Sequence, residues 1–271
     1  MIETPSKLIV HPTDRTTEGL DAFAHALRLA VATKSELHVL HIEGAEESDD
    51  WDPFLEVRDM LIKWRMIEAG ASQAAVADRL GLKVVKVAVK SDDPAHGIAT
   101  YVEPTNCDLM VMMTHLRPVL QHWLEGSIAE TTARETHAPA LFLREGQKGF
   151  VDRETGALSL NVVLMPVEAS VSPLAAFRRI SDLAHTLDPA AEILLLHVGE
   201  DLPLFDGLLP HIELRQGPLI ETILSYSDEI SANLIAMPTT GERWLFDDLR
   251  GTKAERVIHA ASCPVLAVPV R

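Results

Sequence analysis

The residues of this sequence that could do chemistry begin with two acids that follow apolar runs. Residues 7–14 read KLIVHPTD and end at Asp14, and residues 161–168 read NVVLMPVE and end at Glu168. A short run rich in β-branched and aliphatic residues predicts a buried strand. In an open parallel sheet, ligands bind outside the carboxyl ends of the strands, so both acids stand where a ligand would bind.

Two glycine–hydroxyl pairs stand later in the chain, Gly126-Ser127 and Gly251-Thr252. Glycine lets the backbone approach a phosphate closely, and a hydroxyl at a helix start adds a donor beside free N–H groups. The same pairs fit a simple capping box, because an acidic residue follows each hydroxyl three positions later. Nine residues separate Gly241 from Gly251, and this spacing favours the phosphate interpretation for the second pair.

Other kinds of active site find little support in the sequence. His38 and His41 are three apart on an expected strand and point to opposite faces, so they do not form a metal pair. Cys107 and Cys263 lie in no reactive motif and are expected to be buried, reduced thiols. We identify no catalytic residue and no metal site, and we leave enzymatic activity open while favouring a non-catalytic protein.

The elements that must position these residues occur twice along the chain. Residues 36–42 read ELHVLHI and residues 192–198 read EILLLHV, and both end in Leu-His followed by a β-branched residue. An amphipathic helical pattern precedes each of these strands. Continuous apolar strands that alternate with amphipathic helices predict an α/β fold with parallel sheets covered on both faces.

The repeat predicts two domains of unequal length. We expect a first domain over residues 1–145, a linker over residues 146–158 and a shortened second domain over residues 159–271. The expected linker is rich in glycine and charge and shows no apolar period.

The two copies differ in length between the second strand and the late loop, which is the loop that contains Gly126-Ser127 in the first copy and Gly251-Thr252 in the second. The matched histidines of the second strands are 156 positions apart and the matched glycines of the late loops are 125 apart, so the second copy lacks about 31 residues. Residues 52–80 of the first copy predict a helix whose apolar face holds Phe54, Val57, Leu61, Trp64 and Ile67. Residues 202–210 of the second copy contain two prolines and a glycine, so we expect one covering helix to be missing there.

The charge balance excludes several partners. The chain of 271 residues has 40 acidic and 24 basic side chains, a net charge of −16, which disfavours nucleic acid and an anionic membrane surface. A nucleotide is still possible, because backbone N–H groups and Mg²⁺ bind phosphate without net positive charge. No signal-peptide pattern and no apolar run of membrane-spanning length is present, so we expect a soluble, cytoplasmic protein.

Taken together, the sequence resembles the universal stress protein family in its tandem, two-domain form. The resemblance rests on the Pro-x-acid ending of the first strand, the Leu-His-Val-like ending of the second, the late loop, and closing strands that begin Ala-Pro-Ala-Leu and Cys-Pro-Val-Leu. It implies two Rossmann-like domains of the adenine nucleotide α-hydrolase type, each with five mainly parallel strands. It also implies ATP or AMP as ligand in nucleotide-binding members, and an internal pseudo-dimer paired through the last strands. We expect Mg²⁺ to accompany the nucleotide and the pseudo-dimer to form a further homodimer.

The family's nucleotide-binding positions are carried over residue by residue. In the second copy, the resemblance implies binding by Glu168, Val198, Gly241, Gly251 and Thr252. In the first copy, it implies a weaker set, Asp14, Ile42, Gly126 and Ser127.

The family's ATP-binding pattern is Gly, two residues, Gly, nine residues, Gly, then Ser or Thr. Three positions of this sequence depart from it. Met113 and Leu116 replace both leading glycines of the first late loop, and Pro238 replaces the first glycine of the second. The side chains of Met113 and Leu116 would occupy space through which phosphates pass in the family, so the second copy is the better candidate for nucleotide.

Three functions are compatible with these observations. The first is a regulatory module of the stress response that binds nucleotide without turnover. The second is a nucleotide-free scaffold for dimerisation or interaction, motivated by the lost glycines and the missing helix. The third and weakest is a nucleotide hydrolase, because no base or nucleophile is identifiable.

Overall fold

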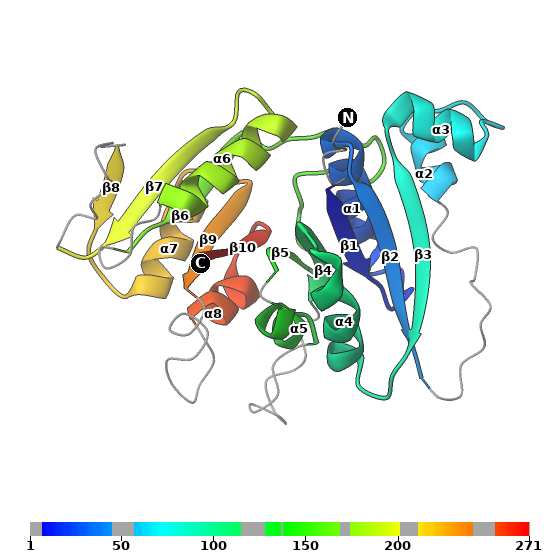
Figure 1. The fold of residues 1–271 in the computed structure, drawn as a ribbon. Coiled ribbons are helices and arrows are strands. Elements are labelled where there is room, and N and C mark those ends of the chain that lie inside the picture. The colour runs from blue at the N-terminus through cyan, green and yellow to red at the C-terminus, as the bar shows by residue number, and fades with distance from the viewer. Residues whose placement is uncertain are drawn as a thin grey trace.

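The computed structural model describes residues 7–44, 57–114, 128–136, 138–168, 174–200, 211–240 and 253–270. Two α/β halves lie side by side and share one sheet (Figure 1). Within these ranges, no helix is long and apolar enough to cross a membrane.

Strands and helices alternate along both halves, as the apolar pattern predicts. The first half contains β1 (Leu8–Pro12), α1 (Leu20–Thr33), β2 (Glu36–Glu43), α2 (Val57–Lys63), α3 (Gln73–Leu80), β3 (Lys83–Lys90), α4 (Pro94–Val102), a short 3₁₀ helix η1 (Glu103–Thr105), β4 (Leu109–Thr114), α5 (Ile128–Thr136) and β5 (Ala140–Arg144). The second half contains β6 (Val162–Pro166), α6 (Leu174–Leu187), β7 (Glu192–Val198), β8 (Ile212–Arg215), α7 (Leu219–Glu229), β9 (Leu234–Thr240), α8 (Lys253–Ala260) and β10 (Val265–Val270).

The ten strands of the described residues form a single sheet in the order β3-β2-β1-β4-β5-β10-β9-β6-β7-β8. Neighbouring strands within each half run parallel. The exception is β5, which pairs antiparallel with β10, with Leu141 opposite Leu266. The expected pairing through the last strands is therefore confirmed.

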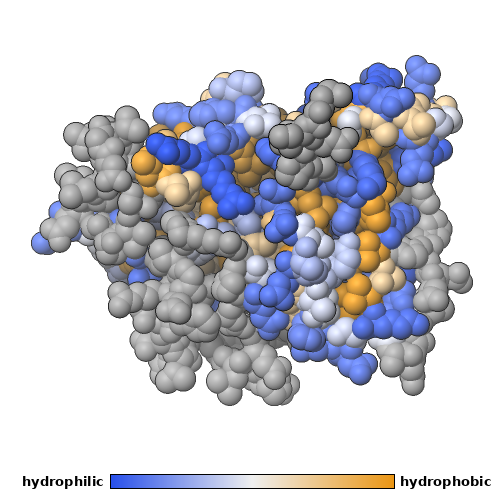
Figure 2. All heavy atoms as spheres, viewed as in Figure 1, coloured by the Kyte–Doolittle hydropathy of each residue, from blue (hydrophilic) through white to orange (hydrophobic). Residues whose placement is uncertain are grey.

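Two apolar layers cover the sheet, one on each face. The first layer joins α1, α2 and α6, and its buried residues include Phe23, Leu61 and Ile180. The second layer joins α4, α5, α7 and α8, and includes Ile98 and Val257. Figure 2 shows mainly hydrophilic surface over the described elements, with narrow hydrophobic stripes between them.

The helix expected over residues 52–80 is broken into two. Helix α2 ends at Lys63, and the backbone turns at Arg65 and Gly70, both with positive φ, before α3 begins. The apolar period still predicts burial correctly, because Leu61 is fully buried and Trp64 and Ile67 are each 6% exposed. A left-handed turn interrupts the helix without changing which side chains face the core.

The corresponding interval of the second half is much shorter. The expected loss of a helix concerns residues 201–210, which lie outside the described residues. Among the residues that the structure describes, α2 and α3 have no counterpart between β7 and β8, and α6 alone covers this face of the second half.

The end of β5 holds the two halves together. Arg144 donates from Nη1 to the carbonyl of His259 at 2.7 Å and from Nη2 to that of Ala261 at 2.9 Å. Gln147 donates from Nε2 to the carbonyls of Ala261 and Cys263, at 2.9 and 2.7 Å. These bonds satisfy carbonyls in the last turn of α8 and in the segment between α8 and β10.

The connecting segment between β5 and β6, residues 145–161, packs on the first half. His25 of α1 is fully buried, donates from Nδ1 to the carbonyl of Asp21 at 2.7 Å, and accepts from the N–H of Val151 at 3.1 Å. The Phe150 ring meets the His25 ring edge-on, with centroids 4.7 Å apart. Burial lowers the pKa of His25 to about 4, so the ring is neutral and Nε2 is free to accept.

A second contact fixes the far end of the same segment. Trp64 donates from Nε1 to the carbonyl of Arg153 at 2.9 Å. Gly156 has φ +69°, and a Cβ there would lie 2.5 Å from the Trp64 ring, so only glycine fits. Glycine is thus part of the packing of this segment.

Acid should destabilise the protein partly through His25. In the unfolded chain the pKa of this histidine is near 6.5, whereas in the fold it is about 4. Between these values the unfolded state binds the additional proton, so the free energy of unfolding falls by about 1.4 kcal/mol per pH unit as the pH drops. Urea unfolding across this window should show that His25→Gln removes this contribution, while His185→Gln, at an exposed position, leaves it in place. Parallel pH profiles for wild type and His25→Gln would contradict the assignment.

Candidate functional site

The acid-bearing loop of the first half is held by a histidine from β2. His41 donates from Nδ1 to the carbonyl of Thr13 at 2.9 Å, directly before Asp14. Asp14 is exposed and accepts from the N–H and the hydroxyl of Thr16, at 3.0 and 2.8 Å. The backbone of the loop is therefore held by a buried side chain, and the carboxylate of Asp14 lies at the protein surface.

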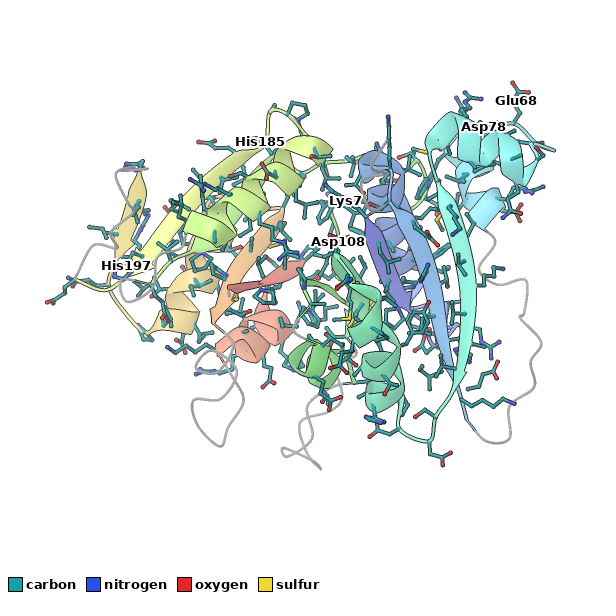
Figure 3. The ribbon with its side chains drawn as sticks, viewed as in Figure 1. Lys7, Glu68, Asp78, Asp108, His185 and His197 are labelled. Carbon is teal, nitrogen blue, oxygen red and sulfur yellow. The ribbon has the colours of Figure 1, made fainter. Side chains whose placement is uncertain are left out.

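The second half repeats this arrangement. His197 of β7 donates from Nδ1 to the carbonyl of Val167 at 2.9 Å, directly before Glu168. Figure 3 shows His197 near the end of β7. Gly199 follows with φ +156°, and a Cβ there would lie 2.7 Å from Nε2 of His197, so glycine is needed beside the ring. The sequence shows the Leu-His repeat, but we did not predict the role of the histidine.

Glu168 lies against the start of α8. Its Oε1 is 3.5 Å from Nζ of Lys253, the first residue of that helix. Both side chains are partly exposed, at 31% and 43%. The structure thus brings the acid after β6 next to the helix that follows Gly251 and Thr252 in the sequence.

Two more of the predicted nucleotide-binding residues lie beside the second apolar layer. Ile42 and Val198 are both half-buried and pack against this layer at the ends of β2 and β7. The Cδ1 atom of Ile42 lies close to Gly97 of α4, at 3.2 Å from where a Cβ of that residue would be. Each therefore lies at the same edge as the acid of its half.

A buried histidine lies beneath the first-half loop. His11 of β1 is 1% exposed and donates from Nδ1 to the carbonyl of Val111 at 2.8 Å, while its Nε2 meets no hydrogen-bond partner among the described residues. Burial lowers its pKa to about 4, so it is neutral at neutral pH. His11 packs against the ring of Phe23 and has a structural place in the core.

The late loops are the part of the predicted site that the structure leaves undescribed. The predicted glycines and hydroxyls lie outside the described residues, namely Gly126, Ser127, Gly241, Gly251 and Thr252, as does Leu116. Of the residues that replace family glycines, Met113 is half-buried against the first apolar layer. Pro238 lies inside β9, opposite Val268 of β10.

Neither cysteine is suited to nucleophilic chemistry. Burial raises the pKa of the Cys107 thiol to about 12 and that of Cys263 to about 11, so both are protonated at neutral pH. Cys263 is buried as expected, whereas Cys107 is only half-buried. Over the described ranges, no group of three or more His, Cys, Asp or Glu side chains is arranged to hold a metal ion.

Comparison with known families decides the identity of the fold. The sequence profile described as the universal stress protein family matches residues 5–144 and 205–269, more than half of the chain. The chain belongs to the universal stress protein family. The second match begins after β7, so it covers β8 to β10 and leaves the loop of Glu168 outside.

Individual relatives agree with this assignment. The universal stress protein MJ0531 of Methanocaldococcus jannaschii is 28% identical over 148 residues, which cover 52% of this chain and 84% of the relative. A universal stress protein structure from Archaeoglobus fulgidus matches 97% of this chain and 96% of its own, with a TM-score of 0.62 and 17% identity. A Pseudomonas aeruginosa structure, described as a putative universal stress protein, matches 97% and 92%, with a TM-score of 0.61 and 17% identity. The two structures show that the tandem fold is shared.

Loss of the His197 hydrogen bond should destabilise this universal stress protein. His197→Phe keeps an aromatic ring but leaves the buried Val167 carbonyl without its side-chain donor, so the free energy of unfolding should fall by about 1–3 kcal/mol. Urea denaturation measures the change. The control His185→Phe alters an exposed histidine of α6 and should shift the value by less than about 0.5 kcal/mol. Equal effects of the two substitutions would show that His197 does not anchor the loop.

Proposed function

We propose that this universal stress protein is a non-catalytic regulatory module of the stress response that binds ATP or AMP in its second half. The observation that carries the proposal is the 3.5 Å approach of Lys253 to Glu168. It joins the acid-bearing loop to the start of α8, so one ligand could contact both. A nucleotide needs these two neighbours, a polar group for its sugar and N–H donors for its phosphates.

The proposed binding residues divide by chemistry. Glu168 would accept from the ribose hydroxyls, and Val198 would lie beside the base. Gly241, Gly251 and Thr252 would surround the phosphates through backbone N–H groups and a hydroxyl. Lys253 and the positive end of α8 would favour negative charge at this point.

Electrostatics set a condition on this binding. With a net charge of −16, the protein repels a triphosphate at long range. We propose that Mg²⁺ accompanies the nucleotide and offsets this repulsion, since Mg²⁺ is commonly held by phosphates and waters. The affinity should then depend on Mg²⁺.

The first half offers a weaker set for the same ligand. Asp14 already accepts two hydrogen bonds from Thr16, and Met113 takes the place of a family glycine. Asp14, Ile42, Gly126 and Ser127 would bind nucleotide less tightly than the second-half residues.

ATP with Mg²⁺ should raise the unfolding temperature of the wild-type protein. A ligand at ten times its dissociation constant stabilises by about 1.4 kcal/mol, which corresponds to about 3–5 °C for a chain of this size. Thermal-shift measurements should show that Gly251→Val abolishes the increase, because a branched side chain occupies the phosphate path.

The matched control is Gly126→Val, at the equivalent position of the first half. It should retain the ATP-dependent increase. Native mass spectrometry of freshly purified protein should in addition show bound nucleotide. Absence of any shift at millimolar ATP and Mg²⁺ would contradict the proposal, and loss of the shift in both variants would contradict the assignment to the second half.

A second candidate, a dimerisation scaffold, is favoured by an exposed apolar residue of β8, Leu214. This four-residue strand ends the sheet, and Leu214 is 45% exposed. The opposite edge strand, β3, instead carries exposed lysines at Lys83, Lys86 and Lys90, which discourage edge pairing. We propose that the β8 edge pairs with a second copy of the chain.

Leu214→Lys should convert such a homodimer to monomer. A charge at the centre of an apolar contact opposes association, so the sedimentation coefficient should fall to that of a single chain. Ile128→Lys is the control, because Ile128 is similarly exposed, at 41%, but lies on α5. A wild-type protein that sediments as a monomer at high concentration would contradict the scaffold.

A further inference from the structure

The junction between the two halves contains equivalent elements from each half, namely the first helix and the last strand. Helices α1 and α6 each have 14 residues, follow the first strand of their half, and contribute to the same apolar layer. They begin at Leu20 and Leu174, so positions that differ by 154 are equivalent and His25 corresponds to Arg179. Because β5 and β10 pair antiparallel, the end of β5 lies beside the start of β10, and the end of β10 lies beside the start of β5. These are the two equivalent ends of the junction.

One end of the junction is filled by the chain itself. After β5, Gln147 donates to the carbonyls that precede β10, and the backbone reaches α1 at Gly149 and Phe150. There, the N–H of Val151 meets Nε2 of His25. The segment from Gln147 to Val151 thus lies between the start of β10 and the second turn of α1.

The equivalent place at the other end is a cavity of about 440 Å³. The end of β10 and the first turns of α6 form one side, and the segments that precede β4 and β5 form the other. Figure 3 shows Asp108 near the middle of the molecule, where the halves meet. The lining residues that carry charge or hydrogen-bonding groups are Glu103, Asn106, Asp108, Thr136 and Arg179.

The chemistry of the cavity differs from that of the filled end in two respects. Arg179 replaces His25, so a group that only donates stands where the filled end has an acceptor. The occupant must therefore offer an acceptor, such as a carboxylate, in place of the Val151 N–H. Glu103 and Asp108 add negative charge on the opposite side, which favours a basic group in the same occupant. Asp108 accepts from the N–H of Leu8 through Oδ2 at 2.8 Å, so its other oxygen, Oδ1, is the one that would meet this group.

We propose that this cavity binds an extended peptide of a partner protein that ends in an apolar residue with a free carboxylate and has a basic residue shortly before it. The carboxylate pairs with Arg179, the basic side chain faces Glu103 and Asp108, and the apolar side chain occupies the volume beside Ala176 and Val268. At the filled end, residues 147–151 show that the place between the strand junction and the helix accepts a peptide backbone. The proposal is independent of nucleotide binding in the second half.

A synthetic peptide that copies the segment at the filled end tests the proposal. The peptide is Gly-Gln-Lys-Gly-Phe, which repeats residues 146–150, labelled at its N-terminus and with a free carboxylate at Phe. In the cavity, this carboxylate would lie at the position that corresponds to the Val151 N–H of the filled end and would meet Arg179. Fluorescence anisotropy should detect binding to the wild-type protein. Arg179→Ala and the peptide with an amidated C-terminus should each weaken binding about tenfold or more, while Arg178→Ala, at the neighbouring exposed arginine, should leave it unchanged.

The same experiment separates the alternatives. Far-UV circular dichroism of the variants establishes that each is folded. No binding of the free-acid peptide at millimolar concentration, or equal binding of the acid and amide forms, would overturn the proposal. Binding of free phenylalanine as tight as that of the pentapeptide would assign the cavity to a small molecule and would also overturn it.

Discussion

The antiparallel pairing of β5 with β10 is the interaction on which the arrangement of the two halves depends. It joins two five-stranded parallel sheets into one and keeps α1 and α6 on the same face. It brings Arg144 to the carbonyls of His259 and Ala261 at the end of α8. Because the strands run in opposite directions across this pair, the carboxyl ends of the two halves point to opposite edges at the junction. Each half therefore has its own acid-bearing loop, and no single small ligand contacts both.

Each acid-bearing loop is shaped by a buried hydrogen bond. His41 and His197 donate to the carbonyl directly before the acid, so the position of the loop is set from the core. The acid itself remains available at the edge, where Glu168 meets Lys253 and Asp14 accepts from Thr16. The fold thus fixes the backbone of the site and leaves the side chains to determine its chemistry, which is where the two halves differ.

Apolar periodicity predicted the alternation of strands and helices, the inward-facing residues near Trp64 and the acids at the strand ends, because these depend on local pattern. Periodicity did not predict features that depend on the backbone conformation of one residue or on contacts between residues far apart in the sequence. The left-handed turn at Arg65 divides one expected helix, and periodicity carries no signal for it. The bond from His41 to Thr13 joins residues 28 apart, so no local spacing reveals it. The glycine content of the connecting segment predicts a linker but does not predict how it packs. Gly156 is required because Trp64 leaves no room for a side chain.

The place of β5 within the sheet also has a consequence for how the chain folds as it is synthesised. In the finished protein β5 lies between β4 and β10, and four of its five residues are buried. During synthesis its outer edge has no partner until the whole second half has been made, since β10 is the last strand of the order along the chain. An unpaired apolar edge can pair with other chains. The nascent first half therefore exposes an apolar strand edge through which it can aggregate until β10 has been made.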